Sequence, residues 1–241
     1  MIPIFDGWYQ NEDGTYDLCF AYFNMNLEED LHIPVGPDNY VRPNEFDGNQ
    51  PTHFHRVPPE ARRTYCAFVV NVPANFGDRR VIWTLRRNGN VYATPGHITK
   101  REYLLEDRFQ RSEDRVSPWV SMVAPVSSKP VRGRRGLTVG PAAGSVGKPM
   151  TLSVSVRDAE PMSTAEQPRQ FEAYWYKHSG PPGAVTFSAN HVELEQGQDV
   201  ATVTATFAEP GEYVLRVLGM NGDFFSHCCW TNTFLRVTVT P

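Results

Sequence analysis

The sequence lacks long apolar runs. Its uninterrupted apolar runs are short, such as residues 67–70. A helix needs about 20 consecutive apolar residues to cross a bilayer, so no transmembrane segment is expected. Neither sign of charge dominates, because 23 basic residues stand against 27 acidic ones for a net charge of −4. The global basic field that would attract nucleic acid is missing, so nucleic acid is not an expected partner.

Apolar residues at helical spacing are also scarce. The one candidate helix covers residues 100–115, and it is highly charged with few apolar positions. By contrast, 20 prolines and 18 glycines interrupt a chain of 241 residues. This composition predicts an all-β protein with many turns.

The first residues lack the charged and apolar regions of a secretory signal peptide. A secreted protein whose signal has been removed would begin in the same way. The fold and the cysteines are therefore the features that indicate the compartment. It is extracytoplasmic: the periplasm, the cell surface or the surrounding medium.

The first half of the sequence contains two predicted hairpins. One turns through residues 11–14, where Gly14 is expected to adopt a positive φ. The other turns at Asn88 and Gly89, the pair that a type I′ turn prefers. Residues 38–59 are polar, rich in proline and too long for a simple connection, so they form a candidate functional loop.

The second half reads as a complete β-sandwich module. Residues 199–217 alternate apolar and polar positions on both sides of a turn at Pro210 and Gly211, which predicts a strand, a turn and a strand. About seven strands fit into roughly 120 residues, the number expected of a Greek-key sandwich. The sequence therefore predicts two β-sandwich domains, residues 1–116 and residues 117–241.

Residues 205–217 (ATFAEPGEYVLRV) resemble the penultimate hairpin of PKD-like and other bacterial immunoglobulin-like surface modules. The alternating strand at residues 234–240 is similar to the strand that ends those domains. Within residues 137–241, the resemblance implies an immunoglobulin-like fold with Trp175 in the core and Tyr213 as a corner tyrosine. The first domain resembles no named family.

The four cysteines allow three pairings. Cys228 and Cys229 are adjacent, so a bridge between them would be strained but would form a rigid apolar ring. Alternatively, one of them bridges to Cys19 or Cys66, or all four are reduced. A Cys19–Cys66 bridge is compatible with the adjacent one and would connect two strands of the first domain.

Aromatic residues in strands and loops are the candidate contact surface, because exposed rings stack on sugars and anchor protein interfaces. The segment that carries Phe224 and Phe225 is also where the chain departs from the usual short loop of the module. For any single aromatic residue of an all-β protein, a place in the core is the commoner outcome. The residues considered are Trp8, Tyr9, Tyr174, Tyr176, Phe224, Phe225 and Trp230.

Metal binding is the alternative chemistry. His53 and His55 lie two residues apart, so an extended strand would put both imidazoles on one face. His32 or Glu60 would be the third ligand, although surface histidines are the commoner explanation. Calcium bound by loop carboxylates, such as those of residues 28–30, is a further possibility, whereas a solvated acidic rim is the ordinary one.

Residues 127–136 have the composition of a linker, with four cations among residues 129–135. A solvated linker is expected, and contact with an anionic polymer or lipid headgroups is the alternative.

No Gly-x-Ser-x-Gly or His-Glu-x-x-His motif occurs in the sequence. The function that the sequence favours is a non-catalytic extracytoplasmic binding or structural module, which contacts a protein or a glycan and needs no cofactor. A subunit of an envelope or extracellular assembly is one form of it. The alternative is a metal-binding protein or metal-dependent enzyme that uses His53 and His55.

Overall fold

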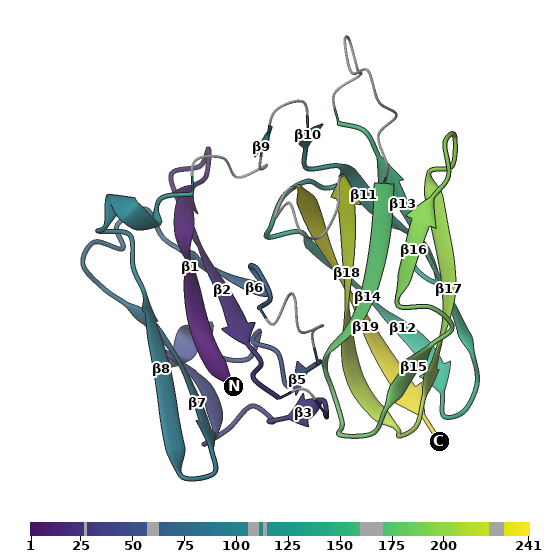
Figure 1. Ribbon diagram of the computed structural model, residues 1–241, viewed down its shortest axis with the longest axis horizontal. Helices are drawn as coiled ribbons and strands as arrows, with labels where there is room; N and C mark the ends of the chain where they lie inside the picture. Colours follow the sequence, from purple (N-terminus) through teal and green to yellow (C-terminus); the bar gives the residue numbers. More distant parts are fainter. Residues whose placement is uncertain (27, 57–62, 106–110, 113–114, 160–170, 222–228) are drawn as a thin grey trace. The chain divides into compact units, whose positions relative to one another are not determined.

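The computed structural model describes residues 1–26, 28–56, 63–105, 111–112, 115–159, 171–221 and 229–241 of the chain (Figure 1). Contacts divide it into a first unit, Met1–Arg108, and a second unit, Phe109–Pro241. The sequence-based boundary near residue 116 lies a few residues further on, at the end of β10 (Arg115–Val116), which pairs with β9 (Arg111–Ser112).

The first unit is built from antiparallel strands. Two three-stranded sheets have the orders β1-β2-β6 and β4-β7-β8, and β3 pairs with β5 in a third, smaller sheet. The strands are β1 (Ile2–Gln10), β2 (Tyr16–Phe23), β3 (Leu31–His32), β4 (Asn39–Arg42), β5 (His53–Phe54), β6 (Phe68–Val72), β7 (Val81–Arg87) and β8 (Asn90–Gly96).

Aromatic side chains fill the space between the two larger sheets of the first unit. Trp83 of β7 is fully buried. Its ring meets Phe68 of β6 edge-on with a centroid distance of 5.0 Å, and Phe20 of β2 at 6.4 Å. Since residues of both sheets share one apolar core, the first unit is a β-sandwich, as the sequence predicts.

The two predicted turns of the first unit are confirmed. Gly14 has a φ of 82°, and Asn88 and Gly89 have φ values of 50° and 73°. Because both central residues of the second hairpin are in the left-handed region, it has the backbone that a type I′ turn requires.

The candidate loop at residues 38–59 is largely built into the fold. It contains β4, the 310 turn η1 (Asn44–Phe46) and β5. The side chain of Asn39 is fully buried and donates to the carbonyls of Ile33 and Pro51 at 2.9 and 2.8 Å. Its Oδ1 accepts the indole N–H of Trp83 at 2.9 Å. This network ties the segment to the core of the first unit.

The second unit is a sandwich of two sheets with the orders β11-β13-β17-β15 and β12-β19-β18-β14-β16. β12 pairs with β19 in parallel, and the other pairs are antiparallel. The strands are β11 (Trp119–Ala124), β12 (Leu137–Ser145), β13 (Met150–Arg157), β14 (Phe171–Ser179), β15 (Val185–Phe187), β16 (His191–Leu194), β17 (Val200–Phe207), β18 (Gly211–Asn221) and β19 (Trp230–Thr240).

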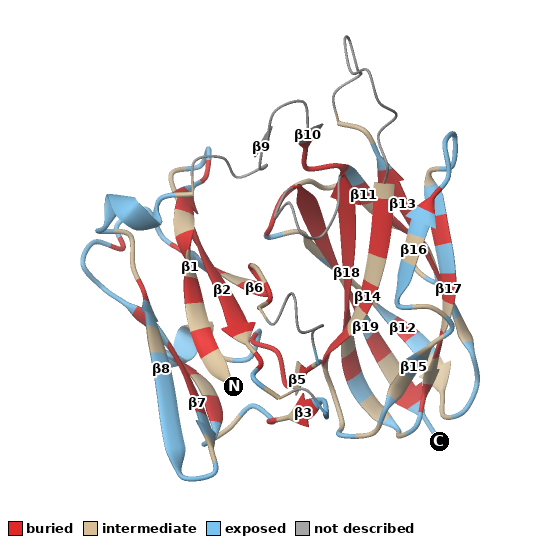
Figure 2. Cartoon of the chain, in the orientation of Figure 1, coloured by how far each residue is buried: buried red, intermediate tan, exposed pale blue. Residues whose placement is uncertain are grey.

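The chain crosses repeatedly between these two sheets, which gives the immunoglobulin-like Greek-key arrangement that the sequence predicts. Buried residues alternate with more exposed ones along strands such as β17 (Figure 2). Trp175 of β14 is 1% exposed in the core. The hydroxyl of Tyr213 on β18 donates to the carbonyl of Glu209 at 2.8 Å, as a corner tyrosine does.

The candidate helix at residues 100–115 is absent from the described part of that segment. The structure has the 310 turn η3 (Arg101–Tyr103) there, followed by the strands β9 and β10. The high charge and few apolar positions of this segment leave no apolar stripe to hold a longer helix against a core.

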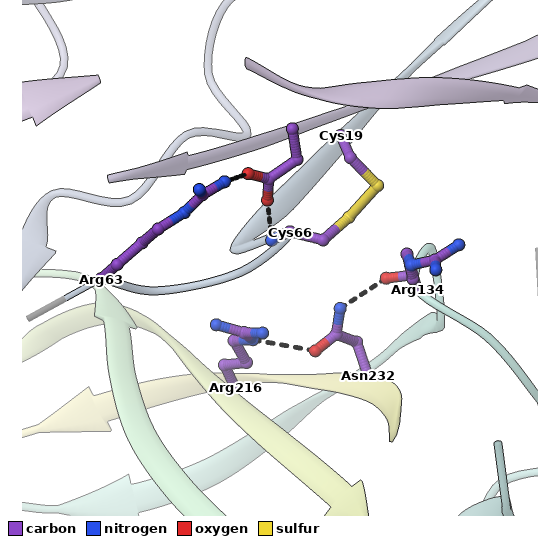
Figure 3. The surroundings of a disulfide bond; sticks show 7 residues. Cys19, Arg63, Cys66, Arg134, Arg216 and Asn232 are labelled. Atoms are coloured by element: carbon purple, nitrogen blue, oxygen red, sulfur yellow. Dashed lines mark hydrogen bonds and ion pairs between the residues drawn. A yellow bond between two sulfur atoms is a disulfide. The ribbon is translucent and has the colours of Figure 1, made fainter. Parts of the chain in front are cut away.

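The expected solvated linker at residues 127–136 is also corrected by the structure. Val131 forms a bridge with Val120 of β11, and the amide of Gly133 donates to the hydroxyl of Thr231 at 3.0 Å. Asn232 of β19 donates to the carbonyl of Arg134 and accepts from Nε of Arg216 at 2.9 Å (Figure 3). The backbone of this basic segment is thus fixed on the second unit.

Candidate functional site

Cys19 and Cys66 form a disulfide in the first unit (Figure 3). Cys19 lies on β2, and Cys66 lies just before β6, the strand that pairs with β2. Near the bridge, a carboxylate oxygen of Asp6 accepts the amide N–H of Cys66 at 2.6 Å, and Asp6 also pairs with Arg63. One of the bridges considered from the sequence is therefore present.

Cys229 is also in a disulfide, so none of the three described cysteines carries a free thiol. Cys228 lies outside the described residues, as do Phe224 and Phe225. The rigid contact loop expected at these positions stays a prediction.

Two of the other aromatic candidates, Tyr9 and Trp230, have little free surface. Tyr9 is 4% exposed and Trp230 is 6% exposed. Trp8 is half-buried: its indole N–H donates to the carbonyl of Lys100 at 3.1 Å, and its ring meets Tyr16 edge-on at 5.7 Å. A binding role for Trp8, Tyr9 and Trp230 remains a prediction.

The two histidines of the metal hypothesis contact different neighbours. Nε2 of His53 lies 3.3 Å from a carboxylate oxygen of Asp30. Nδ1 of His55 lies 2.8 Å from the hydroxyl of Tyr22. His32, a suggested third ligand, is the direct cross-strand partner of His53, whereas Glu60 lies outside the described residues. Metal binding by His53 and His55 stays a prediction.

The pKa of the Asp30 carboxyl is strongly lowered. Partial burial opposes its ionisation, but hydrogen bonds from His53 and the Arg56 amide, with the charges of His53 and His55, lower its pKa to about 2. A carboxylate with a depressed pKa stabilises the folded state above its unfolded pKa near 4, and that stability is lost as the pH falls toward 2.

We expect Asp30→Asn to lower the free energy of unfolding near pH 5 by less than about 1 kcal/mol, because the Asp30 side chain is 44% exposed and solvent screens its interactions. The difference from the unmodified protein should vanish between pH 4 and pH 2. Urea unfolding at several pH values measures it. In a His53→Ala background the effect should shrink, and an equal effect there would contradict this ion pair.

A group that the sequence did not reveal lies at the edge of the five-stranded sheet. The last strand of that sheet is β16, and it pairs with β14 so that Glu172 faces Glu193 and Tyr174 faces His191. These side chains alternate with the core residue Ala173, so they point to the outer face of the sheet. We call Glu172, Tyr174, His191 and Glu193 the edge cluster.

The edge cluster is connected by hydrogen bonds and ring contacts. The hydroxyl of Tyr174 donates to Oε2 of Glu172 at 2.6 Å, and Nε2 of His191 lies 3.3 Å from the same oxygen. The rings of Tyr174 and His191 stack with a centroid distance of 4.3 Å and an interplanar angle of 13°. Tyr176 extends the row, parallel to Tyr174 at 6.3 Å.

Burial and the Glu172 carboxylate raise the pKa of Tyr174 far above its usual value. The hydroxyl therefore stays protonated and continues to donate to Glu172. Burial likewise raises the pKa of Tyr176 to about 12. At neutral pH both rings are uncharged, so they form a short aromatic row next to two carboxylates.

The sequence contains part of this signal. Glu172, Tyr174 and Tyr176 alternate with core positions, which shows that they share one outer face. Their partners on β16 depend on strand register after an intervening strand, β15, that joins the other sheet. Residue spacing alone does not determine that register.

No helix in the described residues is long and apolar enough to cross a membrane.

No protein-family model matches the sequence, and no curated protein sequence matches it. Among solved structures, an MSP family member of C. elegans, WR4, is similar to 41% of this chain and 92% of its own, at 6% identity and a TM-score of 0.30. A PapD-like domain of human CEP192 matches over 60% and 94%, at 12% identity and a TM-score of 0.32.

Domains 4 and 5 of the S-layer protein SbsC match over 68% of this chain and 66% of theirs, at 10% identity and a TM-score of 0.27. Similarities of this size carry no argument about family or function. The fold assignment rests on the strands and sheets themselves, and the PKD-like resemblance stays a prediction.

Proposed function

We propose that this chain is a non-catalytic extracytoplasmic module that binds a protein or glycan partner, as part of an envelope or extracellular assembly. The observation that carries the proposal is the edge cluster with its partly exposed aromatic row on the outer face of the immunoglobulin-like sandwich. Immunoglobulin-like sandwiches carry many unrelated functions, so the fold alone would not support it.

The disulfide supports the compartment. Cys19 and Cys66 are joined, and Cys229 is also in a disulfide. Disulfides persist in oxidising compartments and are rare where glutathione and thioredoxin keep thiols reduced. The proposal therefore places the chain outside the cytoplasm.

The chemistry of the edge cluster suits a sugar. Aromatic rings contact the apolar faces of sugars, and carboxylates accept hydrogen bonds from their hydroxyl groups. His191 and Glu193 are exposed, while Tyr174 is half-buried between neighbouring rings. A bound sugar would lie along this row and against the carboxylates.

An array of immobilised neutral and acidic oligosaccharides, probed with the full chain, tests the glycan form of the proposal. We expect Tyr174→Ala to weaken binding to any positive oligosaccharide at least tenfold, because it removes one ring and unstacks His191. The matched control is Tyr92→Ala, which removes an exposed tyrosine on β8 of the first unit. Equal binding by the Tyr174 variant would refute a role for the row, and an array without a positive signal would leave the protein partner.

A further inference from the structure

The metal-ligating atoms of Glu172, His191 and Glu193 lie within 4.8 Å of one another, and within the described residues this is the group of three that meets that distance. We propose that these three side chains bind one divalent transition-metal ion, with zinc the best fit. This site is separate from the His53 and His55 pair, and it does not depend on a glycan or protein partner.

Strand pairing brings two carboxylates together at this edge. Glu172 and Glu193 face each other directly on antiparallel strands, an arrangement that is destabilising for like charges. The Glu172 residue is only 7% exposed, so water solvates its carboxylate poorly. A divalent cation bound between the two strands would interact favourably with both carboxylates.

The geometry is close to that of a coordination sphere. Bonds of about 2.0–2.2 Å to nitrogen and oxygen place the ligand atoms of a metal about 3–4 Å apart. The distances between the ligand atoms therefore have to shorten by about 1 Å. Rotation about the side-chain bonds of the exposed His191 and Glu193 can bring the atoms together. Glu172 is held in place by its contacts with Tyr174 and His191.

Tyr174 holds the ligands in orientation. Its hydroxyl donates to Glu172, and its ring stacks on the imidazole of His191. Partners of this kind, which touch the ligands and not the metal, fix the orientation of ligands in metal sites. One imidazole nitrogen with two carboxylates suits zinc better than calcium, which prefers six to eight oxygen ligands.

Three protein ligands leave a tetrahedral zinc ion with one free position. The exposed side of the cluster is formed by His191 and Glu193, so a water molecule or a donor atom of a partner can occupy that position. The site is thus suited to hold a second molecule at the edge of the sheet.

Isothermal titration of the chelator-treated, tag-free full chain with zinc chloride tests the proposal. We expect one ion per chain with a dissociation constant in the micromolar range, and a melting temperature that rises with zinc concentration. His191→Ala and Glu193→Gln should each weaken binding at least tenfold. The His53→Ala, His55→Ala double variant is the matched control and should bind zinc as the unmodified chain does.

Cobalt replacement gives a second readout. Cobalt bound by one imidazole and two carboxylates should produce visible absorption bands that Glu193→Gln changes, and this exposed substitution should leave the fold intact. The proposal is overturned if zinc does not bind saturably, or if neither variant weakens binding. It is also overturned if binding is lost only in the His53, His55 double variant.

Discussion

Replacing Cys19 and Cys66 together by alanine should lower the free energy of unfolding of the first unit by about 4 kcal/mol. The bridge joins residues 47 positions apart, and removing it restores the conformational entropy of that loop to the unfolded chain. A loss of this size is a large part of the usual stability of a domain. Urea unfolding followed by circular dichroism and tryptophan fluorescence measures it.

The control for this experiment is the Cys228→Ser, Cys229→Ser double variant. We expect it to leave the unfolding of the first unit unchanged and the second sandwich folded, because Trp175 and Tyr213 belong to a core cluster that does not include the described Cys229. A loss of less than about 1 kcal/mol on removing Cys19 and Cys66 would contradict the loop-closure argument. Failure of the control variant to fold would show that Cys228 and Cys229 are structural.

Replacing Trp83 by alanine should also cost about 4 kcal/mol. The fully buried indole on β7 contacts Phe20 and Phe68 of the other large sheet, and truncation of such a side chain leaves a cavity. It also leaves the buried Oδ1 of Asn39 without the indole N–H, at a cost of about 1–3 kcal/mol. Since Asn39 holds Ile33 and Pro51, residues 38–56 should become more susceptible to proteolysis.

A pair of phenylalanine variants separates the cavity from the hydrogen bond. Trp83→Phe removes a donor that Asn39 uses, whereas the indole N–H of Trp175 has no hydrogen-bond partner within the described residues. Trp83→Phe should therefore be more destabilising than Trp175→Phe by about 1–2 kcal/mol. Equal losses would show that the bond to Asn39 contributes little.

Local chemistry explains what the sequence predicted well. A type I′ turn needs two adjacent residues that tolerate a positive φ, such as Asn88 and Gly89. These two residues are therefore enough to predict the hairpin. The corner formed by Tyr213 and Glu209 likewise spans only a few residues. Alternation of apolar and polar residues then identifies the strands and the faces that enter the core.

What the sequence missed depends on contacts between distant segments. The basic segment around Arg134 has the composition of a linker. However, the carbonyl of Arg134 accepts a hydrogen bond from the side chain of Asn232, which lies far along the chain. The edge cluster depends on the register that places His191 opposite Tyr174. His53 and His55 are two residues apart in the sequence, whereas Glu172 and His191 are brought together only by the pairing of β14 with β16.

The parallel pairing of β12 with β19 has a mechanical consequence. β12 begins at Leu137 and pairs along β19 toward the last residues of the chain, with one irregularity between Val139 and Ala142. Tension applied between Leu137 and the C-terminus pulls these two strands past each other along their length. The interstrand bonds on each side of the irregularity then carry the force in shear and break together, which requires more force than unzipping them one at a time.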